Sequence, residues 1–81
     1  MQAEDIRKEM RRQPFVPIRM HLDDGKTYEI RHPEMVFLTT STAYVGIESK
    51  LGSGVAADYD LVSIRHVVRL EFLDQQKTSA N

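Results

Sequence analysis

Apolar and polar residues alternate along two neighbouring segments near the start of the chain. The apolar positions of residues 15–22 and 26–31 are Val16, Ile18, Met20 and Leu22, then Tyr28 and Ile30. Alternation with a period of two is typical of strands that bury one face. An Asp-Gly pair separates the two segments and favours a turn, so the pattern predicts a β-hairpin.

The length of the turn decides which residues face each other across this hairpin. A two-residue loop would set Met20 opposite Glu29 and mix the two faces, whereas a three-residue loop sets Met20 opposite Tyr28. Because burial of one face fixes the register, we expect the three-residue loop, with Gly25 in the left-handed region. Arg19 then lies opposite Glu29 as a surface ion pair.

A helical pattern precedes the hairpin. In residues 2–12, Ala3, Ile6 and Met10 fall on one face at spacings of three and four. Acidic side chains stand in the first turn and basic ones in the last, which suits the helix dipole. So short a helix does not hold on its own in water. We therefore expect its apolar stripe to pack against the sheet.

More strands are expected after the hairpin, at residues 43–48, 55–61 and 66–73. The last strand is expected to point Val68, Leu70 and Phe72 inward, and Asp60 is expected to cap one helical turn at 61–65.

Two shorter segments differ from these strands. Residues 35–38 have no polar face, which indicates cover on both sides, by the barrel interior and by either the helix or a second subunit. Residues 49–54 are rich in glycine and serine and form the most flexible-looking loop.

Length and composition bound the class of protein. The 81 residues make one domain at most, and we expect a helix-plus-barrel domain over 1–73 and a disordered tail over 74–81. The absence of cysteine excludes disulfides and thiolate zinc sites, and a net charge of -1 does not favour nucleic acid. With neither a signal peptide nor a membrane-length apolar run, the chain reads as a soluble cytoplasmic protein.

The expected order of a helix, about five strands and a one-turn helix before the last strand resembles the Sm-like and Src-homology-3-like small barrels. The fold class expected is therefore mainly β, a small five- to six-stranded antiparallel barrel with an N-terminal α-helix. The stretch from Phe15 to Glu34, with Pro14 before it, also resembles a family of small uncharacterised bacterial proteins, of planctomycete type, with a Pro-Phe…Pro…His-Leu-x-Asp-Gly…His-Pro-Glu pattern. That resemblance brings no known activity.

Apolar residues on both faces of residues 35–38 and of the last strand predict an apolar surface outside the core. The leading hypothesis is a non-enzymatic interaction module that self-associates and binds an unknown protein. The predicted interface residues are Met35, Phe37, Val67 and Leu73, with Tyr44 at the rim.

An Sm-like RNA-binding protein is the alternative. Arg11, Arg12, Arg65 and Tyr44 would combine phosphate contacts with base stacking. Acidic residues share the helix with the first two arginines, so a solvated helix face is the favoured interpretation of them.

No constellation indicates an enzyme, a metal, a cofactor, a small-molecule substrate or a membrane partner. The three histidines lack a ligand spacing, and we expect His32 to be a turn residue whose ring bonds a backbone group. Asp23 and Asp24 lie in the hairpin turn, where aspartate bonds the local backbone. None of the serines has the context of an activated nucleophile.

Overall fold

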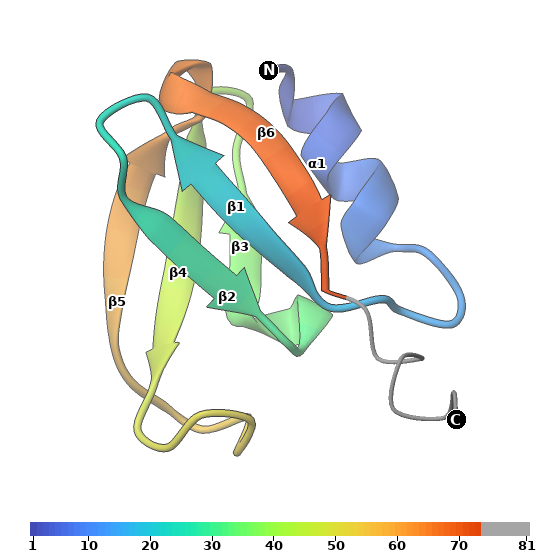
Figure 1. Cartoon of the computed structure of the whole chain (residues 1–81), viewed down its shortest axis with the longest axis vertical. Coiled ribbons are helices and arrows are strands. Elements are labelled where there is room, and N and C mark those ends of the chain that lie inside the picture. The colour runs from blue at the N-terminus through green and yellow to red at the C-terminus, as the bar shows by residue number, and fades with distance from the viewer. Residues whose placement is uncertain (74–81) are drawn as a thin grey trace.

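Two three-stranded antiparallel sheets and one helix make up residues 1–73, the part of the chain that the computed structural model describes (Figure 1). The first sheet has the strand order β2-β1-β6 and the second β3-β4-β5. The bounds are α1 Ala3–Met10, β1 Ile18–Leu22, β2 Thr27–Ile30, β3 Val36–Leu38, β4 Thr42–Glu48, β5 Ala56–Ser63 and β6 Val67–Phe72. Two short 3-10 turns, η1 Pro33–Met35 and η2 Ile64–His66, precede β3 and β6. The predicted tail, 74–81, lies outside the described residues.

The predicted hairpin register is confirmed. β1 and β2 pair with Met20 opposite Tyr28 and Arg19 opposite Glu29. Gly25 has a φ of +92°, in the region that glycine enters without strain, and a three-residue loop joins the strands. Burial of the Met20 face therefore selects the register, as the alternation predicts.

The predicted helix is also confirmed, with its apolar stripe against the sheets. Ile6 is fully buried, and Ala3 and Met10 pack against the core around it. The Gln2 amide donates to the Asp5 carboxylate at 3.1 Å, which satisfies one of the free amides at the helix start.

The core lies between the inner faces of the two sheets. Alternate residues of β1 and β4 point into it, and α1 closes it from one side. Its largest fully buried side chains are Ile6, Ile18, Met20, Ile30, Val45 and Val67.

The last strand differs from its prediction. β6 places Val67 in the core at 1% exposure, whereas Val68 and Phe72 are 56% and 50% exposed. For Val67 and Val68 the cause is a bulge, because Leu22 pairs with Val67 while His21 pairs with Arg69, which leaves Val68 as the extra residue. After the bulge the predicted side is kept. Leu70 and Phe72 lie opposite Met20 and Ile18, and Leu70 packs against the core, whereas Phe72, the last residue of the strand, stays half exposed.

The capping role predicted for Asp60 is wrong. β5 continues to Ser63, and the helical turn begins later, at Ile64. Asp60 is a strand residue whose carboxylate accepts a hydrogen bond from the Tyr28 hydroxyl at 2.7 Å.

The two sheets meet differently on their two sides. α1 lies along β6 (Figure 1), with the Met1 amino group 3.4 Å from the Val67 carbonyl oxygen, and it also contacts β3. On the other side, the bond between Tyr28 and Asp60 links β2 to β5. No strand pairing joins the sheets within residues 1–73, so the mainly β class is confirmed and a closed barrel is not.

The substitution Ile6→Ala tests the packing of the helix. It should lower the free energy of unfolding by about 2–5 kcal/mol, because a fully buried side chain is truncated. Urea denaturation measures this loss. The exposed neighbour Lys8 supplies the control, since Lys8→Ala should change stability by about 0.5 kcal/mol or less. Equal stability of the two variants would contradict the docking of α1.

Candidate interaction surface

The outer face of the β3-β4-β5 sheet is apolar and exposed. The register sets Phe37 beside Tyr44 and Tyr44 beside Leu61, and Tyr59 follows two residues before Leu61 on the same face. Phe37 is 69% exposed, Leu61 61% and Tyr59 57%. We call these four residues the aromatic face.

The rings of the aromatic face touch one another. Phe37 and Tyr44 meet edge to face with 6.1 Å between ring centroids, and Tyr44 stacks on Tyr59 at 6.2 Å. Both distances lie within the range for favourable aromatic pairs. The sheet therefore presents an ordered apolar patch instead of scattered side chains.

Three of the five predicted interface residues come together here. Phe37 and Tyr44 belong to the aromatic face, and Met35 extends it: a Cβ added at Gly46 would lie 2.8 Å from the terminal carbon of Met35. The absence of a side chain at Gly46 thus leaves room for the Met35 side chain to lie over β4. The predicted second cover over residues 35–38 is absent at Phe37 within the described chain, because α1 contacts β3 but leaves the Phe37 side chain 69% exposed.

The other two predicted residues lie away from this face. Val67 is buried in the core, so its predicted outward position is wrong, because the bulge in β6 turns Val67 to the inner face. Leu73 is half-buried at the end of the first sheet, where its amide donates to the Pro17 carbonyl at 2.9 Å. Sequence reasoning missed Tyr59 and Leu61, because their place beside Tyr44 depends on the pairing of β4 with β5.

The outer face of the other sheet carries a charged network. Arg19 lies 2.7 Å from Glu29 and 3.3 Å from Glu71, and the Nε2 of His21 donates to Glu71 at 2.9 Å. The hydrogen bond from Arg19 lowers the pKa of Glu29, and the bond from His21 lowers the pKa of Glu71. Solvated ion pairs suit a face that stays in contact with water. The outer face of the first sheet therefore favours solvent, whereas the apolar outer face of the second sheet favours contact with a protein.

The loop between β4 and β5, predicted to be the most flexible, is held by two side chains. The Glu48 carboxylate, with its side chain 8% exposed, accepts bonds from the amides of Gly52 and Gly54 at 2.8 and 2.7 Å. The His32 ring donates through Nε2 to the Gly52 carbonyl at 2.9 Å, so its predicted backbone bond is confirmed. These bonds tie the loop to the end of β4 and to the segment before η1.

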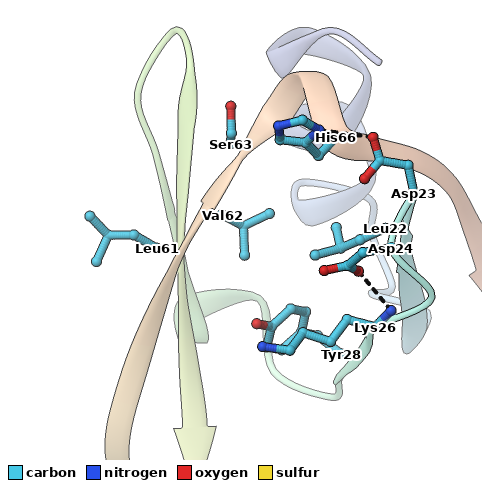
Figure 2. A pocket seen from close by; sticks show the side chains of 9 residues that line it. All are labelled: Leu22, Asp23, Asp24, Lys26, Tyr28, Leu61, Val62, Ser63 and His66. Atoms are coloured by element: carbon cyan, nitrogen blue, oxygen red, sulfur yellow. Dashed lines mark hydrogen bonds and ion pairs between the residues drawn. The ribbon is translucent and has the colours of Figure 1, made fainter.

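An open cleft of about 480 Å³ lies between the hairpin turn and the end of β5 (Figure 2). Val62 points into it and Leu61 points away, toward the aromatic face. The pKa of Tyr28 is raised to about 12, first by burial and then by its bond to Asp60. The further lining residues are Leu22, Asp23, Asp24, Lys26, Ser63 and His66.

His66 and Asp23 form a contact that the sequence pattern did not indicate. The Nδ1 of His66 lies 2.8 Å from the Asp23 carboxylate, and the Asp23 amide donates to the His66 carbonyl at 2.9 Å. This pair ties η2 to the hairpin turn. Among residues 1–73 no hydrogen bond joins the Ser63 hydroxyl to His66. The same residues contain no group of three or more histidine, aspartate or glutamate side chains that could hold a metal ion. We therefore assign the pair a structural role.

The residues of the RNA alternative do not share one surface. α1 begins near Val67 and ends near Phe72, where the Arg12 guanidinium lies 5.3 Å from the Phe72 ring centroid. Arg65 lies before Val67, so the length of β6 separates it from Arg11 and Arg12. Tyr44 lies on the other sheet. RNA binding stays a prediction that this placement does not favour.

Comparisons with models of known families, with curated proteins and with solved structures give no match to this chain. The resemblance to a small bacterial family therefore stays a prediction. Within the described residues, no helix is long and apolar enough to cross a membrane.

The substitution Glu48→Gln tests the anchored loop. Bonds from the two glycine amides lower the pKa of Glu48 below its ordinary value of 4.5. The carboxylate therefore stabilises the fold above pH 4.5, and this contribution is lost as the pH falls through the folded pKa. The variant should be less stable than the wild type at pH 7, and urea unfolding at several pH values should show the difference shrinking below pH 4.5.

Glu34 supplies the control for this experiment, because it is exposed on η1. Glu34→Gln should leave the stability difference near zero across the same pH range. If Glu48→Gln matches the wild type at pH 7, the carboxylate does not hold the loop.

Proposed function

We propose that this chain is a non-enzymatic protein-interaction module that self-associates through the aromatic face. The observation that supports the proposal is the aromatic face, on the outer side of a sheet whose inner side is buried. Phe37, Tyr59 and Leu61 are exposed there around the half-buried Tyr44. Contiguous exposed apolar patches on small proteins mark contacts with other chains. Tyrosine and phenylalanine are also among the residues enriched in the centre of interfaces.

The charged face of the other sheet supports this choice of surface. There, Arg19, Glu29 and Glu71 already pair with one another, and desolvating such pairs in an interface costs free energy. Burying the aromatic face removes apolar area from water instead, which favours association. A partner surface is therefore expected on β3-β4-β5.

The proposal also includes a fold class and a cellular location. We place the two sheets and the helix in the Sm-like or Src-homology-3-like class of small barrels, working in the cytoplasm. What supports the fold class is the order of elements, with one helical turn before the last strand. No chemistry of the described residues calls for a cofactor.

The substitution Phe37→Asp tests the proposed interface. A charge at this position would have to be desolvated on association, so the variant should have the mass of one chain at concentrations where the wild type is larger. Light scattering across a dilution series measures the mass. Because Phe37 is 69% exposed, stability should fall by no more than about 1 kcal/mol.

The matched control is Val68→Asp, which places the same charge at another exposed apolar position. It should associate as the wild type does. A wild type with the mass of one chain at every concentration would overturn the self-association. Equal loss in both variants would show that association does not depend on the aromatic face.

A further inference from the structure

β5 is an edge strand with an unpaired side. Within residues 1–73 this strand pairs only with β4, and most of its eight residues are exposed. The Ile64 amide, just after β5, donates to the Ser41 carbonyl, just before β4, at 2.9 Å. In an antiparallel strand the amide and carbonyl of one residue point to the same edge, and those of the next residue point to the other edge. The backbone groups of Val62 and Asp60 therefore face β4, and those of Leu61 and Tyr59 face the free edge; the Tyr59 amide donates to the Asp58 carboxylate at 2.8 Å.

The two faces of this edge differ in chemistry. Asp58 lies opposite Ile47 and Asp60 opposite Val45, so both carboxylates are on the side of the gap toward β2. Tyr59 and Leu61 are on the outer side. Across the gap, the cleft adds Asp23 and Asp24 and one cation, Lys26. The free edge is therefore acidic on one face and apolar on the other.

The aspartates disfavour a second β5 strand at this edge in the registers that pair most of the strand. Antiparallel pairing of two copies centred on Tyr59 or on Asp60 sets carboxylates opposite one another, and like charges so placed are destabilising. An incoming strand with lysine or arginine opposite these aspartates would instead form pairs of opposite charge, which are stabilising.

We propose that the free edge of β5 binds an extended segment of another protein in which basic and apolar residues alternate. The segment continues the sheet by antiparallel hydrogen bonds to Tyr59 and Leu61. Its basic side chains lie beside Asp58 and Asp60, and its apolar side chains lie beside Tyr59 and Leu61 on the outer face. The edge takes a heterologous partner, whereas self-association in the proposed function uses the outer face.

Fluorescence anisotropy with labelled decapeptides tests this proposal. The probes are a peptide that alternates lysine with valine, a matched peptide that alternates glutamate with valine, and the lysine peptide with every backbone amide N-methylated. The lysine peptide should bind, more weakly as salt is raised. The other two should show no saturable binding, because the glutamate peptide is repelled by the aspartates and the N-methylated peptide lacks the backbone donors.

Variants locate the binding on β5. Asp58→Asn keeps an acceptor for the Tyr59 amide but removes the charge, and it should weaken binding of the lysine peptide about two- to fivefold. Glu34→Gln removes an exposed carboxylate elsewhere and should have no effect. Phe37→Ser removes the ring without adding a charge, and it should leave peptide binding within about twofold even where it abolishes self-association.

The Phe37→Ser arm separates the failure of this inference from the failure of the proposed function. Absence of binding by the lysine peptide would overturn the inference. So would equal binding of the N-methylated peptide, which shows charge attraction without strand addition, or equal binding by Asp58→Asn, which places the contact elsewhere.

Discussion

The contact on which the rest of the structure depends is the packing of Ile6 against the core that lies between the two sheets. The chain has no disulfide, and its core is small, so each fully buried side chain carries a large share of the stability. α1 covers the side of the core that lies between β6 and β3. The opposite side, between β2 and β5, holds an open cleft and the bond between Tyr28 and Asp60.

This asymmetry explains where the molecule offers surfaces to a partner. The helix occupies one side of the fold, and ion pairs cover the outer face of the first sheet. Within residues 1–73, the outer face of β3-β4-β5 and the free edge of β5 stay uncovered, and the two are contiguous through Tyr59 and Leu61. Both proposals rest on this half of the molecule, one on its face and one on its edge.

The hairpin and the helix could be predicted from the sequence because their patterns are local. The Met20 face and the Gly25 turn lie within a few residues of each other, and burial alone selects the register. The phase of β6 could not be predicted, because the bulge at Val68 depends on its pairing with Leu22 and His21, more than forty residues earlier. Pattern counting assumes an unbroken period of two, and the extra residue puts Val67 on the inner face while Leu70 keeps its predicted side.

The candidate surface was predictable only in part, for the same reason. Phe37 stands out in a run without a polar face, but Tyr59 and Leu61 join it only through the β4-β5 register. The anchoring of the loop at residues 49–54 depends on Glu48 and on His32, which lies far from the loop in sequence. Composition shows only the glycines and serines of this loop, and the contacts that hold it come from outside it, so a local pattern does not reveal them.

Amide chemical shifts recorded as a function of protein concentration test the central claim most directly, namely that the aromatic face is where chains of this protein meet. The account predicts that signals of Phe37 and Tyr44 move with concentration while those of Arg19 and Glu29, on the opposite sheet, stay fixed. Movement confined to Arg19 and Glu29, or no movement at all, would contradict it.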